Sequence, residues 1–168
     1  MTISTTTIKD SYSGNDSTTA FSYTFKVSDE DHIQVIIRDS DGVETVKTKT
    51  THYTVAGVGG ASGGTVTMVT APATGETLVL RRATTQTQGL DLIENDPMPA
   101  DNLETAFDKN LSIAQELQEQ IDRSFKVSRT NTITSSEFTT NATDRANKAI
   151  GFDDSGDLTT IADFNPVG

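Results

Sequence analysis

The sequence predicts a mainly β protein, in which an N-terminal antiparallel β-sandwich or small barrel is followed by a long α-helix and a second β-rich segment. Hydrophobic and polar residues alternate over residues 1–92, and a heptad stripe follows over residues 101–125. After residue 126 the helical period is lost. We therefore expect three regions, with limits at 1–95, 96–128 and 129–168.

The first strong strand signal runs from Ala20 to Val27. Phe21, Tyr23, Phe25 and Val27 occupy alternate positions, and polar residues stand between them. A face rich in aromatic residues at period two is typical of a half-buried strand. We expect these side chains to belong to the core of the β-domain.

A hairpin is predicted next, because two strand-like runs at residues 33–37 and 43–47 flank an Asp-Ser-Asp-Gly turn at residues 39–42. Asp side chains bond the backbone of tight turns, and Gly tolerates a positive φ. Further short strands are predicted at residues 53–55, 65–69 and 77–81, separated by loops at residues 57–64 and 71–75. Short strands at such regular spacing favour an antiparallel sandwich or small barrel.

A long helix is predicted from residue 101 to about residue 125. Pro97 and Pro99 exclude a helix before it, Asp101 is a suitable N-cap, and Glu104 stands at the capping-box spacing. A stripe recurs along this helix at alternating steps of four and three residues, which is the spacing of a coiled-coil seam. The stripe consists of Leu103, Phe107, Asn110, Ala114, Leu117 and Ile121, and it is widened by Leu111, Ile113 and Phe125.

Two interpretations of this stripe are open. It can pack against the β-domain of its own chain, as the apolar face of most amphipathic helices does. Alternatively, it can be the interface between copies of the chain. Asn110 favours the second interpretation, because a polar residue in a coiled-coil seam fixes register and strand number. The six stripe residues are therefore the predicted oligomer interface.

The C-terminal segment begins with a Thr- and Ser-rich run at residues 130–143. Residues 149–161 then form a hairpin pattern with Asp-Ser-Gly-Asp at its tip. An isolated two-stranded hairpin is marginal in water. Either three copies pack around an axis, or this segment is a mobile tail.

Composition and charge narrow the class of protein. Hydrophobic residues make up 33% of the chain, Trp and Cys are absent, and 13 basic against 24 acidic residues give a net charge of −11. The charge disfavours nucleic-acid binding, and the absence of cysteine excludes disulfides. No signal peptide and no membrane span is recognisable, so we expect a soluble protein made in a cytoplasm.

No catalytic constellation is recognisable. His32 and His52 have no Gly-x-Ser-x-Gly elbow or zinc-binding spacing near them. The Gly-rich run at residues 57–64 lacks the Gly-Lys-Ser/Thr ending of a phosphate loop. The acidic turns at residues 39–42 and 153–157 lack the glutamate that closes a calcium loop. We therefore expect no enzyme, no bound metal and no cofactor.

The order of several short motifs carries a family resemblance. A hydrophobic-Arg strand end is followed by a Gln-rich connector, a Leu-Glu-x-Ala-x-Asp helix and an Arg near the helix end. The matching positions are Arg81, Gln88, Leu103, Glu104, Ala106, Asp108 and Arg123. The segments at residues 23–25 and 52–55 also fit the pattern, although His52 stands at a position where similar sequences often have an acidic residue. Over residues 5–128 the chain resembles the N-terminal domain of T7-like phage tail fibres and of related podovirus tailspikes.

The resemblance implies a structural virion protein. Its helix would form a trimeric coiled coil, and the segment after it would begin a fibre shaft. The N-terminal end of the homotrimer would dock on tail tube, adaptor or nozzle proteins and anchor the fibre for host adsorption. Two alternatives stay open: an adaptor that bridges the tail to a separate receptor-binding protein, and a glycan-binding β-sandwich. In neither case do we expect nucleic-acid or membrane partners.

Overall fold

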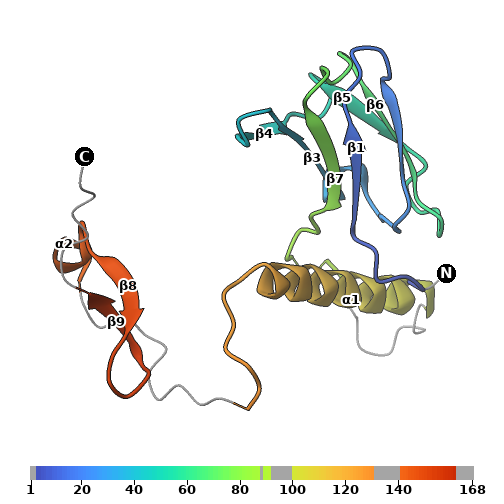
Figure 1. Ribbon diagram of the computed structural model, residues 1–168. Coiled ribbons are helices and arrows are strands. Elements are labelled where there is room, and N and C mark those ends of the chain that lie inside the picture. Colours follow the sequence, from blue (N-terminus) through green and yellow to red (C-terminus); the bar gives the residue numbers. More distant parts are fainter. Residues whose placement is uncertain (1–2, 88, 92–99, 131–140, 162–168) are drawn as a thin grey trace. The chain divides into compact units, whose positions relative to one another are not determined.

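The computed structural model describes residues 3–87, 89–91, 100–130 and 141–161 (Figure 1). The chain forms two compact units, Met1–Arg123 and Ser124–Gly168. The first unit contains a β-sandwich and the long helix α1, and the second contains a β-hairpin. The expected limits at residues 95 and 128 stay a prediction.

The first unit is built around two antiparallel sheets, which confirms the predicted fold class. One sheet has the strand order β1-β7-β3-β4 and the other has the order β2-β6-β5. In the part of this unit that the structure describes, the strands are β1 (Lys9–Ser13), β2 (Ala20–Tyr23), β3 (Ile33–Arg38), β4 (Glu44–Lys47), β5 (Tyr53–Ala56), β6 (Gly64–Met68) and β7 (Thr77–Arg82).

The core lies between the two sheets. It is formed by the alternating inward side chains of the strands and by Phe25 and Val27, which follow β2. The fully buried members, at most 1% exposed, are Tyr23, Phe25, Val27, Val35, Val66, Leu78 and Leu80. Each apolar side chain buried in this way contributes about 1.5–3 kcal/mol. Phe21, Tyr23, Phe25 and Val27 are all buried, so their prediction as core residues is confirmed.

The strand expected from Ala20 to Val27 is shorter than predicted. Strand β2 ends at Tyr23, because the backbone N–H of Thr24 donates a hydrogen bond to a carboxylate oxygen of Asp10 at 2.7 Å instead of to a neighbouring strand. Phe25 and Val27 remain in the core after the chain has left the sheet.

The turn between β3 and β4 forms as expected. One carboxylate oxygen of Asp39 accepts from the backbone N–H groups of Asp41 and Val43 at 3.0 and 2.8 Å. Gly42 adopts a φ of +87°, a conformation that Gly reaches without steric cost. The Asp-Ser-Asp-Gly sequence therefore acts as a structural turn.

Helix α1 spans Ala100–Asp122. Asp101 was expected as the N-cap, and this was wrong, because Asp101 lies within the first turn of the helix. A carboxylate there is still favourable, since the helix dipole leaves a partial positive charge at this end. The helix also ends before Phe125. A short 3-10 turn, η1 (Glu30–His32), precedes β3.

The second unit contains the hairpin predicted at residues 149–161, formed by β8 (Ala149–Phe152) and β9 (Leu158–Ile161). Asp153 closes its tip by accepting from the N–H groups of Ser155 and Asp157, both at 2.9 Å. A short helix, α2 (Ala142–Arg145), precedes the hairpin and was not expected. Most of the Thr- and Ser-rich run lies outside the described residues. None of the described helices is long and apolar enough to cross a membrane.

Candidate assembly face of helix α1

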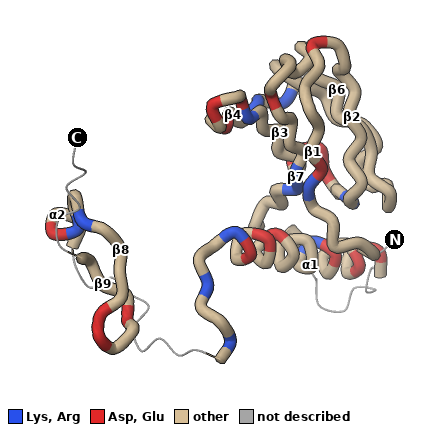
Figure 2. Tube along the Cα trace, viewed as in Figure 1, with Lys and Arg blue, Asp and Glu red and all other residues tan. Residues whose placement is uncertain are grey.

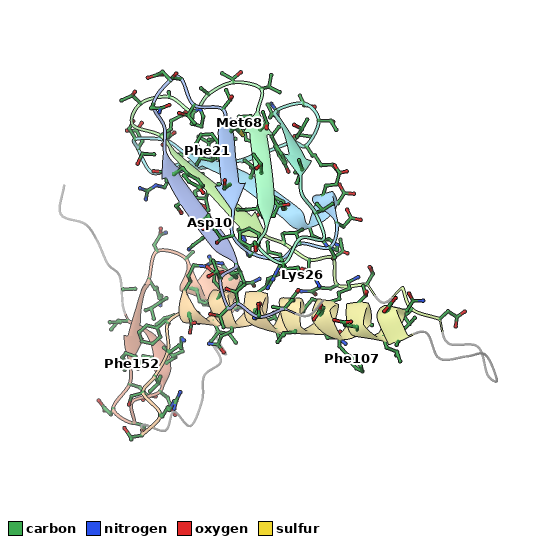
Figure 3. The ribbon with its side chains drawn as sticks, turned by 90° about the vertical axis from the view of Figure 1, so that its right-hand side faces the viewer. Asp10, Phe21, Lys26, Met68, Phe107 and Phe152 are labelled. Atoms are coloured by element: carbon green, nitrogen blue, oxygen red, sulfur yellow. The ribbon has the colours of Figure 1, made fainter. Side chains whose placement is uncertain are left out.

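Helix α1 places a polar face against the sandwich and an apolar face in solvent. Ser112 and Glu116 are each 7% exposed, whereas Phe107 is 67% exposed and Ile121 is 51% exposed. Because an α-helix turns roughly 100° per residue, these two sets of side chains project from roughly opposite sides. Figure 3 shows Phe107 pointing away from the sandwich and Lys26 lying between the sandwich and α1.

The polar face is held by Arg82, the last residue of β7, whose side chain is 1% exposed. Its Nε donates to Oε1 of Glu116 at 3.0 Å, and its Nη2 donates to Oε1 of Gln115 at 2.6 Å. Further bonds reach the carbonyl oxygens of Lys26 and Ser112 at 3.3 and 3.4 Å. A buried guanidinium with this many acceptors is both paired and oriented.

The connector that follows β7 also donates hydrogen bonds to the carboxylate of Glu116. The backbone N–H of Thr84 donates to Oε2 of Glu116 at 2.9 Å, and the Thr84 hydroxyl donates to Oε1 at 2.6 Å. Burial lowers the pKa of Arg82, while the bond and charge of Glu116 oppose that effect. Together, Arg82, Thr84 and Glu116 lock one turn of α1 to the end of β7.

A second anchor lies about two turns earlier on α1. Lys26 Nζ contacts a carboxylate oxygen of Asp108 at 2.7 Å, and the other oxygen accepts from the Ile3 N–H at 3.2 Å. Burial raises the pKa of Asp108, but the bonds from Lys26 and Ile3 outweigh burial and hold that pKa below its usual value. Both side chains of the ion pair are less than one-sixth exposed.

The N-terminal segment adds further contacts along the same face. The Gln115 side-chain amide donates to the carbonyl oxygen of Thr5 at 3.0 Å, and Lys9 lies 3.7 Å from Glu119. Figure 2 shows basic residues at the helix-facing ends of β1 and β7 and acidic residues along α1. The attachment of α1 is therefore polar and electrostatic, and it leaves the apolar stripe out of the sandwich.

The six residues of the predicted interface share the face of α1 that points away from the sandwich. Leu103 is half-buried, and Phe107, Asn110, Ala114, Leu117 and Ile121 are exposed. The interpretation in which the stripe packs on its own β-domain does not describe this chain. Because the structure contains one chain, contact between copies at this face stays a prediction.

The residues that fix this orientation were not singled out from the sequence. Arg82, Thr84 and Glu116 carried no recognised motif. A signal was nevertheless present, because the alternation of Leu78 and Leu80 along β7 places Arg82 on the inward side. A buried Arg requires an acidic partner elsewhere in the chain.

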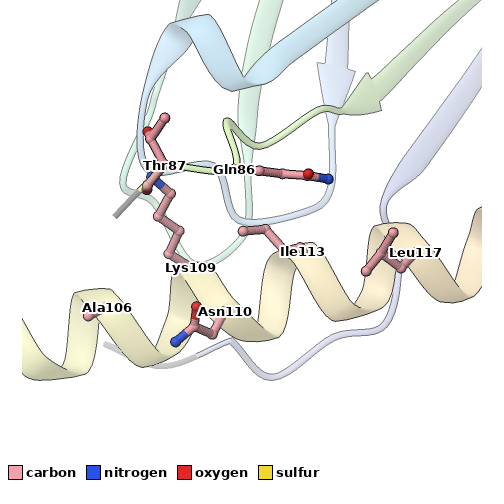
Figure 4. A pocket seen from close by; sticks show the side chains of 7 residues that line it. All are labelled: Gln86, Thr87, Ala106, Lys109, Asn110, Ile113 and Leu117. Atoms are coloured by element: carbon pink, nitrogen blue, oxygen red, sulfur yellow. The ribbon is translucent and has the colours of Figure 1, made fainter. Parts of the chain in front are cut away.

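A pocket of about 350 Å³ lies beside the stripe, between α1 and the connector after β7 (Figure 4). It is lined by Gln86, Thr87, Ala106, Lys109, Asn110, Ile113 and Leu117. Lys109 Nζ donates to the carbonyl oxygen of Thr87, which holds the connector against the helix. Gln88, one of the positions of the resemblance, lies outside the described residues.

The two histidines have structural partners. His32 Nε2 lies 2.9 Å from the Thr85 hydroxyl oxygen, and His52 Nδ1 accepts from the Thr48 N–H at 3.0 Å. Within the described parts of the chain, no three His, Asp or Glu side chains are grouped to hold a metal ion.

Comparison with known proteins agrees with this architecture. Residues 1–135 match the family model of the phage T7 tail fibre protein, N-terminal domain. A tail spike protein of Salmonella phage epsilon15 is 33% identical over 118 residues, which cover 70% of this chain and 11% of that relative. The family match spans the sandwich and the whole of α1, and the chain therefore belongs to the family of phage T7 tail fibre N-terminal domains.

Proposed function

We propose that this structural tail protein is the tail-proximal part of a phage tail fibre, with a non-catalytic role. In this proposal the sandwich anchors the fibre to the tail for host adsorption. Helix α1 holds three copies together, and the segment after it begins the shaft. Membership of the tail fibre family supports the assignment to the virion.

The observation that carries the proposal is the exposed stripe. Phe107, Leu117 and Ile121 are each 45% or more exposed, on a helix whose opposite face is already bonded to the sandwich. Burying the four large apolar side chains of the stripe offers on the order of 10 kcal/mol per chain before conformational entropy is subtracted. Only 33% of the residues are hydrophobic, and the single chain still leaves this apolar surface in solvent, which is unfavourable. Assembly of several copies would bury the surface and remove this cost.

Asn110 supports a defined number of copies. It lies in the middle of the stripe and is exposed in the single chain. An amide buried in a coiled-coil seam reduces stability but selects the register and strand number in which the amides meet. That the number of copies is three is inferred from the family resemblance.

Sedimentation equilibrium on the full chain tests self-association. We expect the mass of three chains for the natural sequence and of one chain for Leu117→Asn combined with Ile121→Asn. The control is Val46→Asn, which changes an exposed valine on β4 and should leave the mass unchanged. A natural chain that stays monomeric at high concentration would remove the basis of the proposal.

Anchoring is tested with tails that lack fibres. The purified chain should bind these tails saturably, and a shaft fragment without the sandwich should not. The adaptor alternative predicts the same tail binding together with capture of a separate receptor-binding protein at the C-terminal segment.

The glycan-binding alternative has less support. A glycan site on the sandwich would use exposed aromatic side chains on its loops, whereas its residues Phe21, Tyr23, Phe25 and Tyr53 are all at most 5% exposed. The exposed residues Phe107, Phe125 and Phe152 lie outside the sandwich. Saturable binding of the chain on a glycan array would reverse this ranking.

A further inference from the structure

We infer that the pocket between α1 and the connector after β7 receives Leu111 of a neighbouring copy, in an assembly whose α1 helices run parallel. This inference rests on the self-association proposed above. It goes further, because it names the residue that crosses between copies, the site that it enters and the relative direction of the chains.

The pocket is preformed in the single chain. One wall is the side of α1 that carries Ala106, Asn110 and Ile113. The other wall is the connector at Gln86 and Thr87. Figure 4 shows Lys109 reaching from α1 to Thr87, so the two walls are joined by a hydrogen bond before any partner arrives.

The heptad positions of α1 place this pocket on one flank of the stripe. If the stripe occupies the seam positions a and d, Phe107 stands at a and Asn110 at d. Ala106 and Ile113 then stand at position g, beside the seam. The polar face that meets the sandwich falls at b, c and f, opposite the seam, so the docked sandwich does not cover this flank.

Leu111 stands at position e, on the other flank of the same stripe. It is 44% exposed, and within its own chain it lies across the seam from the pocket. The other e positions of α1 are Glu104 and Gln118, so Leu111 is the apolar residue among them.

Parallel packing joins these two features. In a parallel coiled coil, position e of one helix faces position g of the next. With the chains in register, Leu111 of one copy stands at the height of Asn110 and Ile113 of its neighbour, which is the middle of the pocket. In an antiparallel pair, e faces e and g faces g, and Leu111 would not meet the pocket.

The assembly that follows is cyclic. Each copy offers one Leu111 on one flank and one pocket on the other, so a closed ring of copies fills every pocket, and the trimer proposed above is such a ring. The connector after β7 then contacts a neighbouring chain as well as its own helix. The connector would therefore contribute, together with the seam, to the specificity with which copies of the chain recognise each other.

Cross-linking of the full chain tests the arrangement, and the absence of natural cysteine makes the background clean. The variant carries Ala106→Cys with Leu111→Cys and is treated with a short bis-maleimide. We expect a covalent trimer on a denaturing gel, because each copy is linked to the next. Each single-cysteine variant should run as a monomer.

The matched control carries Ala106→Cys with Gln118→Cys. Gln118 is also an e position, but it stands about 10 Å further along the helix. It should give no covalent trimer. A link in the single Leu111→Cys variant would show e facing e, and this would overturn the parallel arrangement.

A second variant keeps the test decisive if the double-cysteine chain fails to assemble. Leu111→Lys should raise the dissociation constant of the assembly by roughly tenfold or more, because a buried charge without a partner is strongly unfavourable. Gln118→Lys should change it much less. Equal dissociation constants for Leu111→Lys and the natural chain would overturn the inference.

Sedimentation equilibrium on the natural chain separates the two levels of failure. A monomeric natural chain rejects the proposed self-association. A trimeric natural chain without the link between Ala106→Cys and Leu111→Cys rejects the pocket and leaves the self-association intact.

Discussion

Arg82 Nε and Glu116 Oε1 lie 3.0 Å apart, and the two side chains are 1% and 9% exposed. They stand 34 residues apart in the sequence, one at the end of β7 and the other in the third quarter of α1. Because the pair is buried and geometrically demanding, it fixes which face of α1 meets the sandwich. It thereby also fixes which face is left for other chains.

Removing one partner of this pair should be costly. Glu116→Ala leaves the Arg82 guanidinium buried without its carboxylate, and we expect the free energy of unfolding to fall by about 3–5 kcal/mol. Urea denaturation at a fixed chain concentration measures this change. The control is Arg123→Gln, which removes the pair between the largely exposed Arg123 side chain and Glu119 and should cost far less than Glu116→Ala. Equal losses for both variants would contradict the clamp.

The Asp108 anchor predicts a pH dependence. The pKa of Asp108 is lower in the folded chain than its ordinary value of about 3.9. The carboxylate form therefore favours folding, with its full contribution above about pH 5 and a progressive loss as the pH falls through the folded pKa. We expect Asp108→Asn to cost about 1.5–3 kcal/mol at pH 7 and clearly less near pH 3.

Lys26→Met provides the control for this pH dependence. In that background the cost of Asp108→Asn at pH 7 should shrink, because the main partner of the carboxylate is gone. Urea midpoints of the four chains across this pH range measure both effects. A cost of Asp108→Asn that does not change with pH would argue against the ion pair.

Asn110→Leu should change the number or register of the assembled chains without abolishing assembly. An apolar residue in the seam raises stability and removes the feature that selects one arrangement. Sedimentation equilibrium should show a different mass or a mixture. The control Asn102→Leu replaces an exposed amide at heptad position c, away from the seam and its flanks, and should leave the mass unchanged. A homogeneous trimer from Asn110→Leu would remove the role assigned to the amide.

Two glycines with similar backbone angles should respond differently to a methyl group. Gly63 has a φ of +82°, and an added Cβ would lie 1.8 Å from the carbonyl oxygen of Tyr23. Gly42 has a φ of +87° and open space around the same position. We expect about 1–2 kcal/mol for Gly42→Ala from the backbone angle alone. Gly63→Ala should cost about 1–3 kcal/mol more, because β2 must shift. Thermal unfolding of both variants provides the comparison.

The sandwich could be predicted from the sequence because its signals are local. Phe21, Tyr23 and Phe25 alternate with polar residues, and Asp39 and Gly42 mark a turn by their own backbone chemistry. Such signals depend on neighbours in the chain, so they survive without knowledge of the fold. The end of β2 at Tyr23 was missed because it depends on Asp10, a partner outside the strand.

The heptad stripe could also be predicted from the sequence, but the burial of the opposite face of α1 could not. Asp108, Ser112 and Glu116 look like the solvated side of an amphipathic helix. Their burial depends on Lys26, Arg82 and Thr84, which lie far away in the sequence and are polar themselves. Polar side chains that pair across the fold do not recur at a regular spacing in the sequence. No sequence pattern therefore identifies which of them are partners.

The separation of Arg82 and Glu116 along the chain also sets an order in time during synthesis. At ordinary elongation rates Glu116 is joined to the chain about 2 to 7 seconds after Arg82. The seven described strands of the sandwich all precede Glu116 in the chain. The clamp between Arg82 and Glu116 can therefore form, and the assembly face of α1 can be oriented, only after the sequence of the sandwich has been synthesised.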